Sequence, residues 1–316
     1  MSFGRILIAD DFHPLLMDKL QAAGLDFQYA PNIKRADIIR ELQAGVCGLI
    51  IRSKTPADEE LISAGNSLQF IARGGSGMDN IDETFARNKG IDCFNAAEAN
   101  ADSVGEHTIG MLLALMHNLA KANWEVKNKI WLREENRGTE IGGKTIGIIG
   151  FGNTGSAVAR KLSGFNVRIL AYDKYKTAFG GNGVVETDLK TIQQEADIIS
   201  LHVPLTNETK FMVNSEFLQH CVRKIVLLNL SRGEVVKTAD VAYAIEKNLM
   251  SGFAADVLEC EHFEHYSADD WSWFSVLQKH PRCLLAPHIG GWSFESYQRI
   301  SEVLASRIIE FSAQKK

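Results

Sequence analysis

A glycine-rich turn near the middle of the chain most constrains what this sequence can fold into. The apolar run Thr145–Ile149 leads directly into Gly-Phe-Gly-Asn-Thr-Gly at residues 150–155, and the helical stretch Ser156–Leu162 follows. Glycines are common enough for this spacing alone to arise by chance, but a strand before it and a helix after it are what a dinucleotide-binding βαβ unit requires. The sequence therefore predicts an α/β fold with a Rossmann-type unit at this turn.

Each glycine of the turn has its own expected task. Gly150 allows the tight turn, Gly152 lets the backbone approach a pyrophosphate, and Gly155 lets helix and strand pack closely. The phosphates would bind the unpaired N–H groups of the helix N-terminus, which includes Asn153 and Thr154.

An acidic residue at the end of the next strand indicates which dinucleotide binds. Asp173 follows Gly155 by 18 residues and closes an apolar run. A carboxylate there accepts hydrogen bonds from the adenosine ribose and repels a 2′-phosphate, so NAD is favoured over NADP. The alternative is an ordinary solvent-facing residue at a strand end.

Length and composition narrow the class of protein. The 316 residues suggest about two domains, at roughly 100–200 residues each. A formal net charge of −5 argues against a nucleic-acid partner. Five scattered cysteines without a Cys-x-x-Cys pair argue against disulfides and zinc and favour a reducing cytoplasm. No signal peptide or membrane-spanning run is recognisable, so we expect that the protein is neither inserted in a membrane nor bound to one.

Two successive series of strands and helices follow along the chain. Strands are expected at Arg5–Ala9, Gly48–Arg52, Leu68–Arg73, Thr145–Ile149, Val167–Tyr172, Ile198–His202 and Ile225–Asn229. Helices are expected at Pro14–Ala23 and over a long region from Ser103 to about Lys129, and Leu61–Gly65 is expected to be the end of a further helix. The stretch Cys260–His280 is acidic and aromatic without clear periodicity, which predicts a surface excursion. Its cysteine and histidines show no recurring metal-ligand spacing, so no metal is expected.

Three short islands downstream of the turn carry residue types suited to hydroxy-acid chemistry. They cover residues 229–233, 255–261 and 286–291, each just after an apolar run. In an open parallel sheet that position is the carboxyl edge, where ligands bind. An Arg can grip a substrate carboxylate, a His can exchange the hydroxyl proton, and a carboxylate can hold the His in one tautomer.

With these islands in view, the whole sequence resembles the D-isomer-specific 2-hydroxyacid dehydrogenases. The resemblance also rests on Gly74–Ile81, Asn95–Glu106 and His202–Thr206. It implies a Rossmann-type nucleotide-binding domain inserted in a flavodoxin-like α/β substrate domain. The substrate domain would comprise residues 1–99 and 287–316, and the NAD-binding domain residues 100–286.

The resemblance also implies catalytic roles. Arg232 would hold the substrate carboxylate, His288 would be the general acid/base, and Glu261 would pair with His288. Glu259 is a competitor for that pairing, because His262 stands where the family usually has Pro. Residues implied in cofactor binding are Gly150, Gly152, Asn153, Thr154, Gly155, Asp173, His202, Pro204, Asp256 and Ser103, with Asp256 near the nicotinamide.

Within the family, the glycine loop is most like that of members acting on a phosphorylated hydroxy acid. Backbone N–H groups of Gly74, Gly75, Ser76 and Gly77 would bind the substrate carboxylate. We expect Arg52 and Arg73 to read the phosphate, and Arg133, after Trp131-Leu132, to reach a neighbouring site across a homodimer formed by the Ala101–Lys129 region. The alternative is that these arginines are solvated surface residues.

Several alternatives stay open on sequence grounds. A glyoxylate, hydroxypyruvate or other small 2-keto acid reductase would not need the Arg52/Arg73 pair. An NADH-sensing binding protein, like the corepressors built on this fold, would retain Arg232, Glu261 and His288. Trp292 could narrow the substrate pocket or pack on the last helix. The chain ends at Lys316, so we expect no C-terminal regulatory domain and no serine feedback through one.

Overall fold

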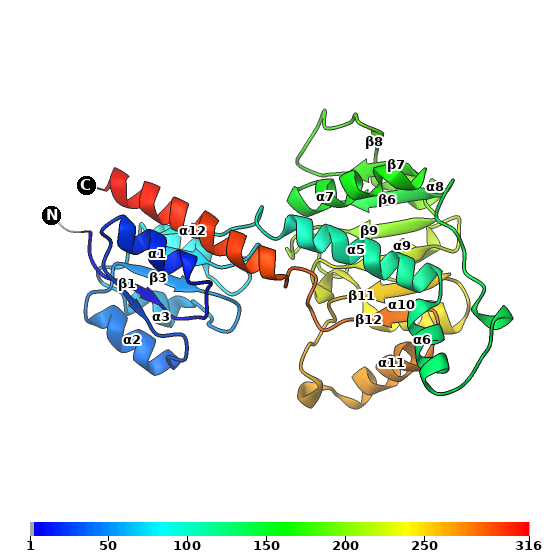
Figure 1. Ribbon diagram of the computed structural model, residues 1–316, viewed down its shortest axis with the longest axis horizontal. Coiled ribbons are helices and arrows are strands. Elements are labelled where there is room, and N and C mark those ends of the chain that lie inside the picture. Colours follow the sequence, from blue (N-terminus) through cyan, green and yellow to red (C-terminus); the bar gives the residue numbers. More distant parts are fainter. Residues whose placement is uncertain (1–2, 316) are drawn as a thin grey trace. The chain divides into compact units, whose positions relative to one another are not determined.

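The computed structural model describes residues 3–315, which form two compact units, each built on its own parallel sheet (Figure 1). The first unit takes in the chain up to Ala101 and again from Gly291 onward, and the second runs from Asp102 to Gly290. The second unit is therefore inserted in the first. Among the described residues no helix has the length and apolar character needed to cross a membrane.

The unit boundaries lie two and four residues later than the sequence-derived ones, at 101/102 and 290/291 instead of 99/100 and 286/287. At the second crossing the difference has a clear cause. The Ser103 hydroxyl donates to the Gly290 carbonyl at 2.8 Å, and the Asp256 carboxylate accepts from the Gly290 N–H at 2.6 Å. These bonds hold the chain to the second unit through Gly290.

The first unit has a five-stranded sheet in the order β2-β1-β3-β4-β5, which is the flavodoxin-like arrangement. Its strands are β1 (Ile6–Ile8), β2 (Phe27–Tyr29), β3 (Gly48–Ile51), β4 (Phe70–Arg73) and β5 (Asp92–Phe94). Its helices are α1 (Leu15–Ala22), α2 (Arg35–Gln43), α3 (Glu59–Ser63), α4 (Glu83–Asn88) and α12 (Phe294–Gln314).

Helices cover both faces of this sheet, which explains its continuous apolar strands. In β1, Ile6 and Ile8 pack with residues of α1 and α12, whereas Leu7 packs with residues of α2 and α3. The last helix of the chain, α12 (red), lies beside the first, α1 (blue), in Figure 1. The C-terminal helix therefore completes the core that the N-terminal segment begins.

The second unit has a seven-stranded sheet in the order β12-β11-β10-β9-β6-β7-β8. Its strands are β6 (Thr145–Ile149), β7 (Arg168–Tyr172), β8 (Val184–Glu186), β9 (Ile198–Leu201), β10 (Val226–Asn229), β11 (Gly252–Ala255) and β12 (Cys283–Leu285). The order reverses between β6 and β9, which is the ligand-binding switch point of a Rossmann sheet. The predicted fold class is confirmed.

Two layers of helices enclose this second sheet. They are α5 (Ala101–Met116), α6 (Leu119–Lys127), α7 (Asn153–Leu162), α8 (Leu189–Glu195), α9 (Ser215–Gln219), α10 (Thr238–Glu246) and α11 (Ala268–Lys279). In β6, Ile146 and Ile148 pack with α5 and α7, and Ile149 packs in the cluster formed by α8 to α11. Because β6 is packed on both faces, the position of the glycine turn that follows it is fixed relative to the sheet.

The helical region expected from Ser103 to Lys129 is two helices rather than one. α5 ends at Met116 and α6 begins at Leu119, with Asn118 between them in the left-handed conformation at φ 54°. Asn tolerates that conformation better than most residues, and a left-handed residue ends the run of α-helical hydrogen bonds.

The surface excursion expected over Cys260–His280 is wrong for its second half. Residues 268–279 form α11, which begins at a capping box between Ser267 and Asp270. Trp273, Phe274 and Leu277 are buried against the second unit's core. Further aromatic side chains on the exposed side of the segment hide this helical period in the sequence.

Candidate active site

The glycine turn has a geometry that a side chain at either of two positions would prevent. Gly150 adopts φ +93°, and a Cβ there would lie 2.5 Å from the His202 carbonyl oxygen. A Cβ on Gly155 would lie 2.0 Å from the carbonyl oxygen of Gly150. Both contacts are with backbone, which cannot move aside, so only glycine fits.

Gly152 differs from its two neighbours in the motif, because a Cβ there would meet nothing within 4 Å. Gly152 is also the residue from which α7 starts. Open space beside a helix N-terminus is what a pyrophosphate needs in order to accept backbone N–H bonds there. The turn therefore fits a dinucleotide, with Asn153 and Thr154 in the first turn of the helix.

Asp173 lies just beyond β7 and is held by main-chain N–H groups. Its carboxylate accepts from Phe151 at 2.8 Å, from Tyr175 at 2.9 Å and from Lys176 at 3.1 Å. A carboxylate offers about four acceptor positions, so one is left for a ribose hydroxyl. Its fixed charge beside the turn disfavours a 2′-phosphate, as expected for NAD.

His202 follows β9 and is a neutral residue at physiological pH. Its Nε2 lies 2.8 Å from the Ser200 hydroxyl, and its Nδ1 is buried with no hydrogen-bond partner in the part of the chain that the structure describes. Burial lowers the pKa of His202 to about 4, since a protonated ring would lose its hydration. Pro204, two residues on, is exposed.

His202 should make the protein less stable in acid. Its pKa is about 4 when folded and about 6.5 when unfolded, so the unfolded chain binds the extra proton below pH 6.5. Stability is therefore full above pH 6.5 and falls as the pH drops toward 4. Between pH 8 and pH 4.5 we expect the wild type to lose about 2–3 kcal/mol more than His202→Gln in urea unfolding. Equal losses would contradict a neutral buried His202.

Strand register brings the three islands to one edge of the second sheet. Asn229 at the end of β10 pairs with Ala255 of β11, and Ala255 pairs with Leu285 of β12. Arg232, Asp256 and His288 come one to three residues after these paired positions. All three therefore leave the carboxyl edge of neighbouring strands.

The structure distinguishes the two candidate partners of His288. The Nδ1 atom of His288 lies 2.9 Å from the Glu261 carboxylate. Glu259 instead accepts from the backbone N–H of Thr238, at the start of α10. Glu259 is thus occupied at a helix N-terminus, where a negative charge is favourable. Glu261 fixes the His288 tautomer and leaves Nε2 for a reacting group.

His288 has an uncommon backbone conformation, with φ +56°. Asp256 holds it from both sides of the turn: its carbonyl accepts from His288 N–H at 2.7 Å, and its carboxylate accepts from Ile289 N–H at 2.9 Å. Burial raises the pKa of Asp256, but the nearby His107 ring and the hydrogen bonds from the N–H groups of Ile289 and Gly290 outweigh it, and the net pKa is lowered. Asp256 therefore stays ionised and keeps the His288 segment in place.

His107 on α5 supports the same carboxylate, and the sequence did not point to it. Its Nε2 lies 3.4 Å from Asp256 Oδ1, a long contact compared with the two main-chain bonds. In the sequence, His107 is marked only by its place directly after the segment Asn95–Glu106. A lone His on a helix is usually a packing residue, so this position did not indicate a role. Its position became visible only with α5 folded over β11.

Arg232 lies in the loop after β10, which packs tightly on the next loop. A Cβ on Gly233 would lie 1.8 Å from the Leu258 carbonyl oxygen, so the two backbones touch at this glycine. The Asn229 side chain donates to the Arg232 carbonyl at 2.9 Å, and Arg232 itself donates to the Ser231 carbonyl at 2.7 Å. These contacts fix the position of the Arg232 backbone, from which the guanidinium side chain extends.

In the first unit, the loop after β4 presents backbone donors. Gly74 donates to Ile51 at 2.8 Å, and Gly75 accepts from Ala96 at 2.9 Å, which anchors the loop. Within residues 3–315, the N–H groups of Ser76 and Gly77 donate to no protein acceptor. Two adjacent free N–H groups suit a carboxylate oxygen.

The three arginines expected to read a phosphate have different surroundings. Arg73 lies beneath the loop, because a Cβ on Gly75, at φ +146°, would meet its guanidinium at 1.8 Å. Arg52 follows β3 and lies among aromatic rings. Arg133 belongs to the second unit and is exposed just before a short 3₁₀ turn, Glu134–Asn136.

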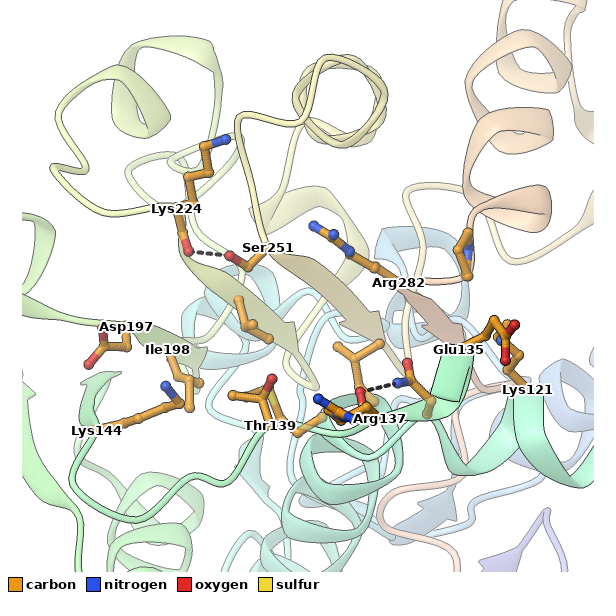
Figure 2. A pocket seen from close by; sticks show the side chains of 15 residues that line it. Lys121, Glu135, Arg137, Thr139, Lys144, Asp197, Ile198, Lys224, Ser251 and Arg282 are labelled. Atoms are coloured by element: carbon orange, nitrogen blue, oxygen red, sulfur yellow. Dashed lines mark hydrogen bonds between the residues drawn. The ribbon is translucent and has the colours of Figure 1, made fainter. Parts of the chain in front are cut away.

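A cavity of about 560 Å³ lies at the opposite edge of the second sheet (Figure 2). Lys144, Asp197, Lys224 and Arg282, which line it, come just before β6, β9, β10 and β12. This is the amino edge, whereas the glycine turn and His288 lie at the carboxyl edge. None of the site residues expected from the sequence lines this cavity.

Comparison with known proteins shows the family to which the chain belongs. Residues 109–290 match the family described as "D-isomer specific 2-hydroxyacid dehydrogenase, NAD binding domain". The chain belongs to this family, as its sequence predicted, and its second unit is an NAD-binding domain.

Named relatives and a solved structure that are similar to this chain differ in the substrate that their names give. D-3-phosphoglycerate dehydrogenase of Bacillus subtilis is 31% identical over 313 residues, covering 95% of this chain and 57% of that protein. The enzyme of the same name from Dictyostelium discoideum is 32% identical over 307 residues, covering 97% and 74%. D-lactate dehydrogenase from Aquifex aeolicus, solved with NAD and lactic acid, is 26% identical with a TM-score of 0.83, covering 98% and 96%. The chain thus spans little more than half the length of several curated relatives.

Proposed function

We propose that this protein catalyses the NAD-dependent, reversible oxidation of D-3-phosphoglycerate to 3-phosphohydroxypyruvate, a step toward serine. The observation that carries the chemistry is the fixed Glu261–His288 pair, with Nδ1 bound and Nε2 left for the substrate, at the same sheet edge as Arg232 and the NAD turn. The two named relatives with 31% and 32% identity support the phosphorylated substrate.

Each residue would have one task during the oxidation. Arg232 binds the substrate carboxylate through paired N–H donors and so orients C2. His288 Nε2 takes the proton of the C2 hydroxyl, and Glu261 stabilises the resulting imidazolium. Asp256 keeps His288 in position. NAD, when bound at the Gly150–Gly155 turn, supplies the hydride acceptor.

The phosphate end of the substrate would be read in the first unit. Arg52 carries a guanidinium that forms no ion pair with any carboxylate of residues 3–315. The free N–H groups of Ser76 and Gly77 provide a second place for substrate oxygens. Guanidinium groups bind phosphate through two parallel hydrogen bonds, which a substrate without phosphate would not use.

A substrate panel tests this proposal directly. NADH oxidation is followed at its absorbance maximum with 3-phosphohydroxypyruvate, hydroxypyruvate, glyoxylate and pyruvate at equal concentrations. We expect kcat/KM for the phosphorylated acid to exceed that for hydroxypyruvate at least tenfold, which is about 1.4 kcal/mol. Preference for glyoxylate or pyruvate would replace the proposed substrate, and NADH binding without any turnover would support a sensing protein instead.

We further propose that two copies of the chain associate through α6 and the segment after it. This stretch exposes large apolar side chains: Leu119, Trp124, Val126, Ile130, Trp131 and Leu132. Trp131 is 81% exposed. So many large apolar side chains exposed within one short stretch are typical of a protein–protein contact, and Arg133 would then reach the partner.

The interface proposal predicts a change of mass in solution. We expect sedimentation velocity to show a wild-type dimer, and Trp131→Glu to raise its dissociation constant at least tenfold, since buried Trp residues dominate interface energetics. Val222→Glu, at another strongly exposed apolar side chain (74%), is the matched control and should leave the dimer intact. A monomeric wild type at micromolar concentration would refute the interface.

A further inference from the structure

The start of the last helix places two aromatic rings over one arginine. Ser293 caps α12 in a reciprocal capping box with Ser296. Trp292 therefore precedes the cap, and Tyr297 is the fourth residue of the helix. These are the two positions of a hydrophobic staple, in which the side chains meet across the cap. The ring centroids lie 6.0 Å apart.

Both rings of this staple contact the guanidinium of Arg52. Its Cζ lies 4.4 Å from the Trp292 ring centroid, 5.6 Å from that of Tyr297 and 5.7 Å from that of Phe12. All three distances are within the range of cation–π attraction, and Trp is the strongest partner. Three rings thus restrict a side chain that would otherwise be flexible.

Phenol hydrogen bonds hold the cluster together. The Asp11 carboxylate accepts from Tyr297 at 2.7 Å and from Tyr29 at 2.8 Å. Each of these bonds uses one oxygen of the carboxylate. The Arg52 guanidinium instead donates to the backbone carbonyl of Asp11, at a long 3.4 Å. Asp11 therefore orients Tyr297 without forming an ion pair with Arg52.

The neighbouring carboxylate is also committed elsewhere. Asp10 is buried, accepts from the backbone N–H of Arg52 at 2.7 Å, and pairs with Lys54 at 2.9 Å. Its charge is balanced by Lys54, and its contact fixes the Arg52 backbone rather than the guanidinium.

We propose that Trp292, with Tyr297 and Asp11 behind it, is a positioning residue that holds Arg52 ready to bind the distal anionic group of the substrate, a phosphate or a carboxylate. Cation–π contacts use the faces of the guanidinium and leave its N–H edges to donate to an oxyanion. A clamped guanidinium also loses less rotational freedom when it binds, which favours affinity. This inference rests on the proposed function in so far as the group is a phosphate.

The kinetic test compares substrates with and without a distal charge. We expect Trp292→Ala to raise KM for 3-phosphohydroxypyruvate about 3- to 30-fold with kcat within twofold, and to leave KM for hydroxypyruvate unchanged. Trp292→Phe should recover part of the loss, because a ring returns. Phe294→Ala is the matched control, since Phe294 is 90% exposed two residues further on and should change nothing.

A second readout needs no substrate. Phenylglyoxal modifies accessible guanidinium groups, and peptide mass spectrometry measures the rate at Arg52, with exposed Arg40 as internal reference. We expect the rate at Arg52 to rise at least threefold in Trp292→Ala and to stay unchanged in Phe294→Ala. An unchanged rate at Arg52 in Trp292→Ala would overturn the clamp.

The same variants separate this inference from the proposed function. If 2-oxoglutarate rather than the phosphorylated acid is the good substrate, and both Arg52→Ala and Trp292→Ala raise its KM, the clamp is supported and the proposed function fails. If Arg52→Ala raises KM for 3-phosphohydroxypyruvate and Trp292→Ala does not, the clamp is overturned while the function stands. If Arg52→Ala affects neither acid, Arg52 is no anion receptor and the inference is overturned.

Discussion

Replacing His288 by Asn should lower kcat about 10²- to 10⁴-fold, the usual contribution of a positioned general acid/base. Asn is the informative substitution because His288 has φ +56°, and Asn tolerates this left-handed conformation well. Alanine would add backbone strain to the loss of the imidazole and confuse the two effects. The measurement is steady-state turnover with 3-phosphohydroxypyruvate, or with whichever 2-keto acid the panel selects.

Two controls make the His288 result specific. NADH affinity, followed by fluorescence, should stay within twofold of the wild type, because His288 is absent from the glycine turn. Glu261→Gln should lower kcat less than His288→Asn, since the imidazole remains and only its stabilising partner, 2.9 Å away, loses its charge. A kcat within threefold of wild type in His288→Asn would remove the proton-transfer role.

Replacing Arg232 by Gln should lower kcat/KM about 30- to 5,000-fold, which corresponds to about 2–5 kcal/mol for removing one partner of a desolvated charge pair. The substrate carboxylate would lose both its countercharge and its bidentate donor. Arg232→Lys should recover only part of the loss, because an ammonium cannot reproduce the planar pair of N–H donors.

Arg223→Gln is the matched control for this experiment. Arg223 is an exposed arginine at the amino edge of the same sheet, where it pairs with Asp197 at 2.8 Å. A surface ion pair contributes little to stability, so this variant should turn over normally. Equal activity of Arg232→Gln and Arg223→Gln would mean that Arg232 does not bind the substrate.

The parts of the fold that depend on local patterns could be predicted from the sequence. The turn at residues 150–155 is one, because its glycines are demanded by contacts within a single strand–turn–helix unit, such as Gly155 against the Gly150 carbonyl. Buried strands such as β6 and β10 are another, since parallel strands covered on both faces are continuous apolar runs. The short edge strands β2, β5 and β8 lacked that signal.

Where a local pattern was ambiguous, the tertiary structure decided. Periodicity alone did not reveal the break at Asn118, because one left-handed residue leaves the apolar spacing of α5 and α6 almost intact. It did not reveal α11 either, because exposed aromatic residues surround the buried Trp273 and Phe274. In both cases packing against distant segments selects the conformation.

By itself the sequence determined the class of chemistry: a dinucleotide turn, an acidic residue for a ribose, and an Arg, a Glu and a His that each follow an apolar run. These features are local, so the order of residues is enough to show them. Which carboxylate meets His288, what holds its left-handed backbone, and what lies over Arg52 were decided only in three dimensions. Glu261 and His288 are 27 residues apart, and Arg52 and Trp292 lie in segments at opposite ends of the chain. Strand register and helix capping bring such groups together in space. The number of residues between them in the sequence does not predict that they are close.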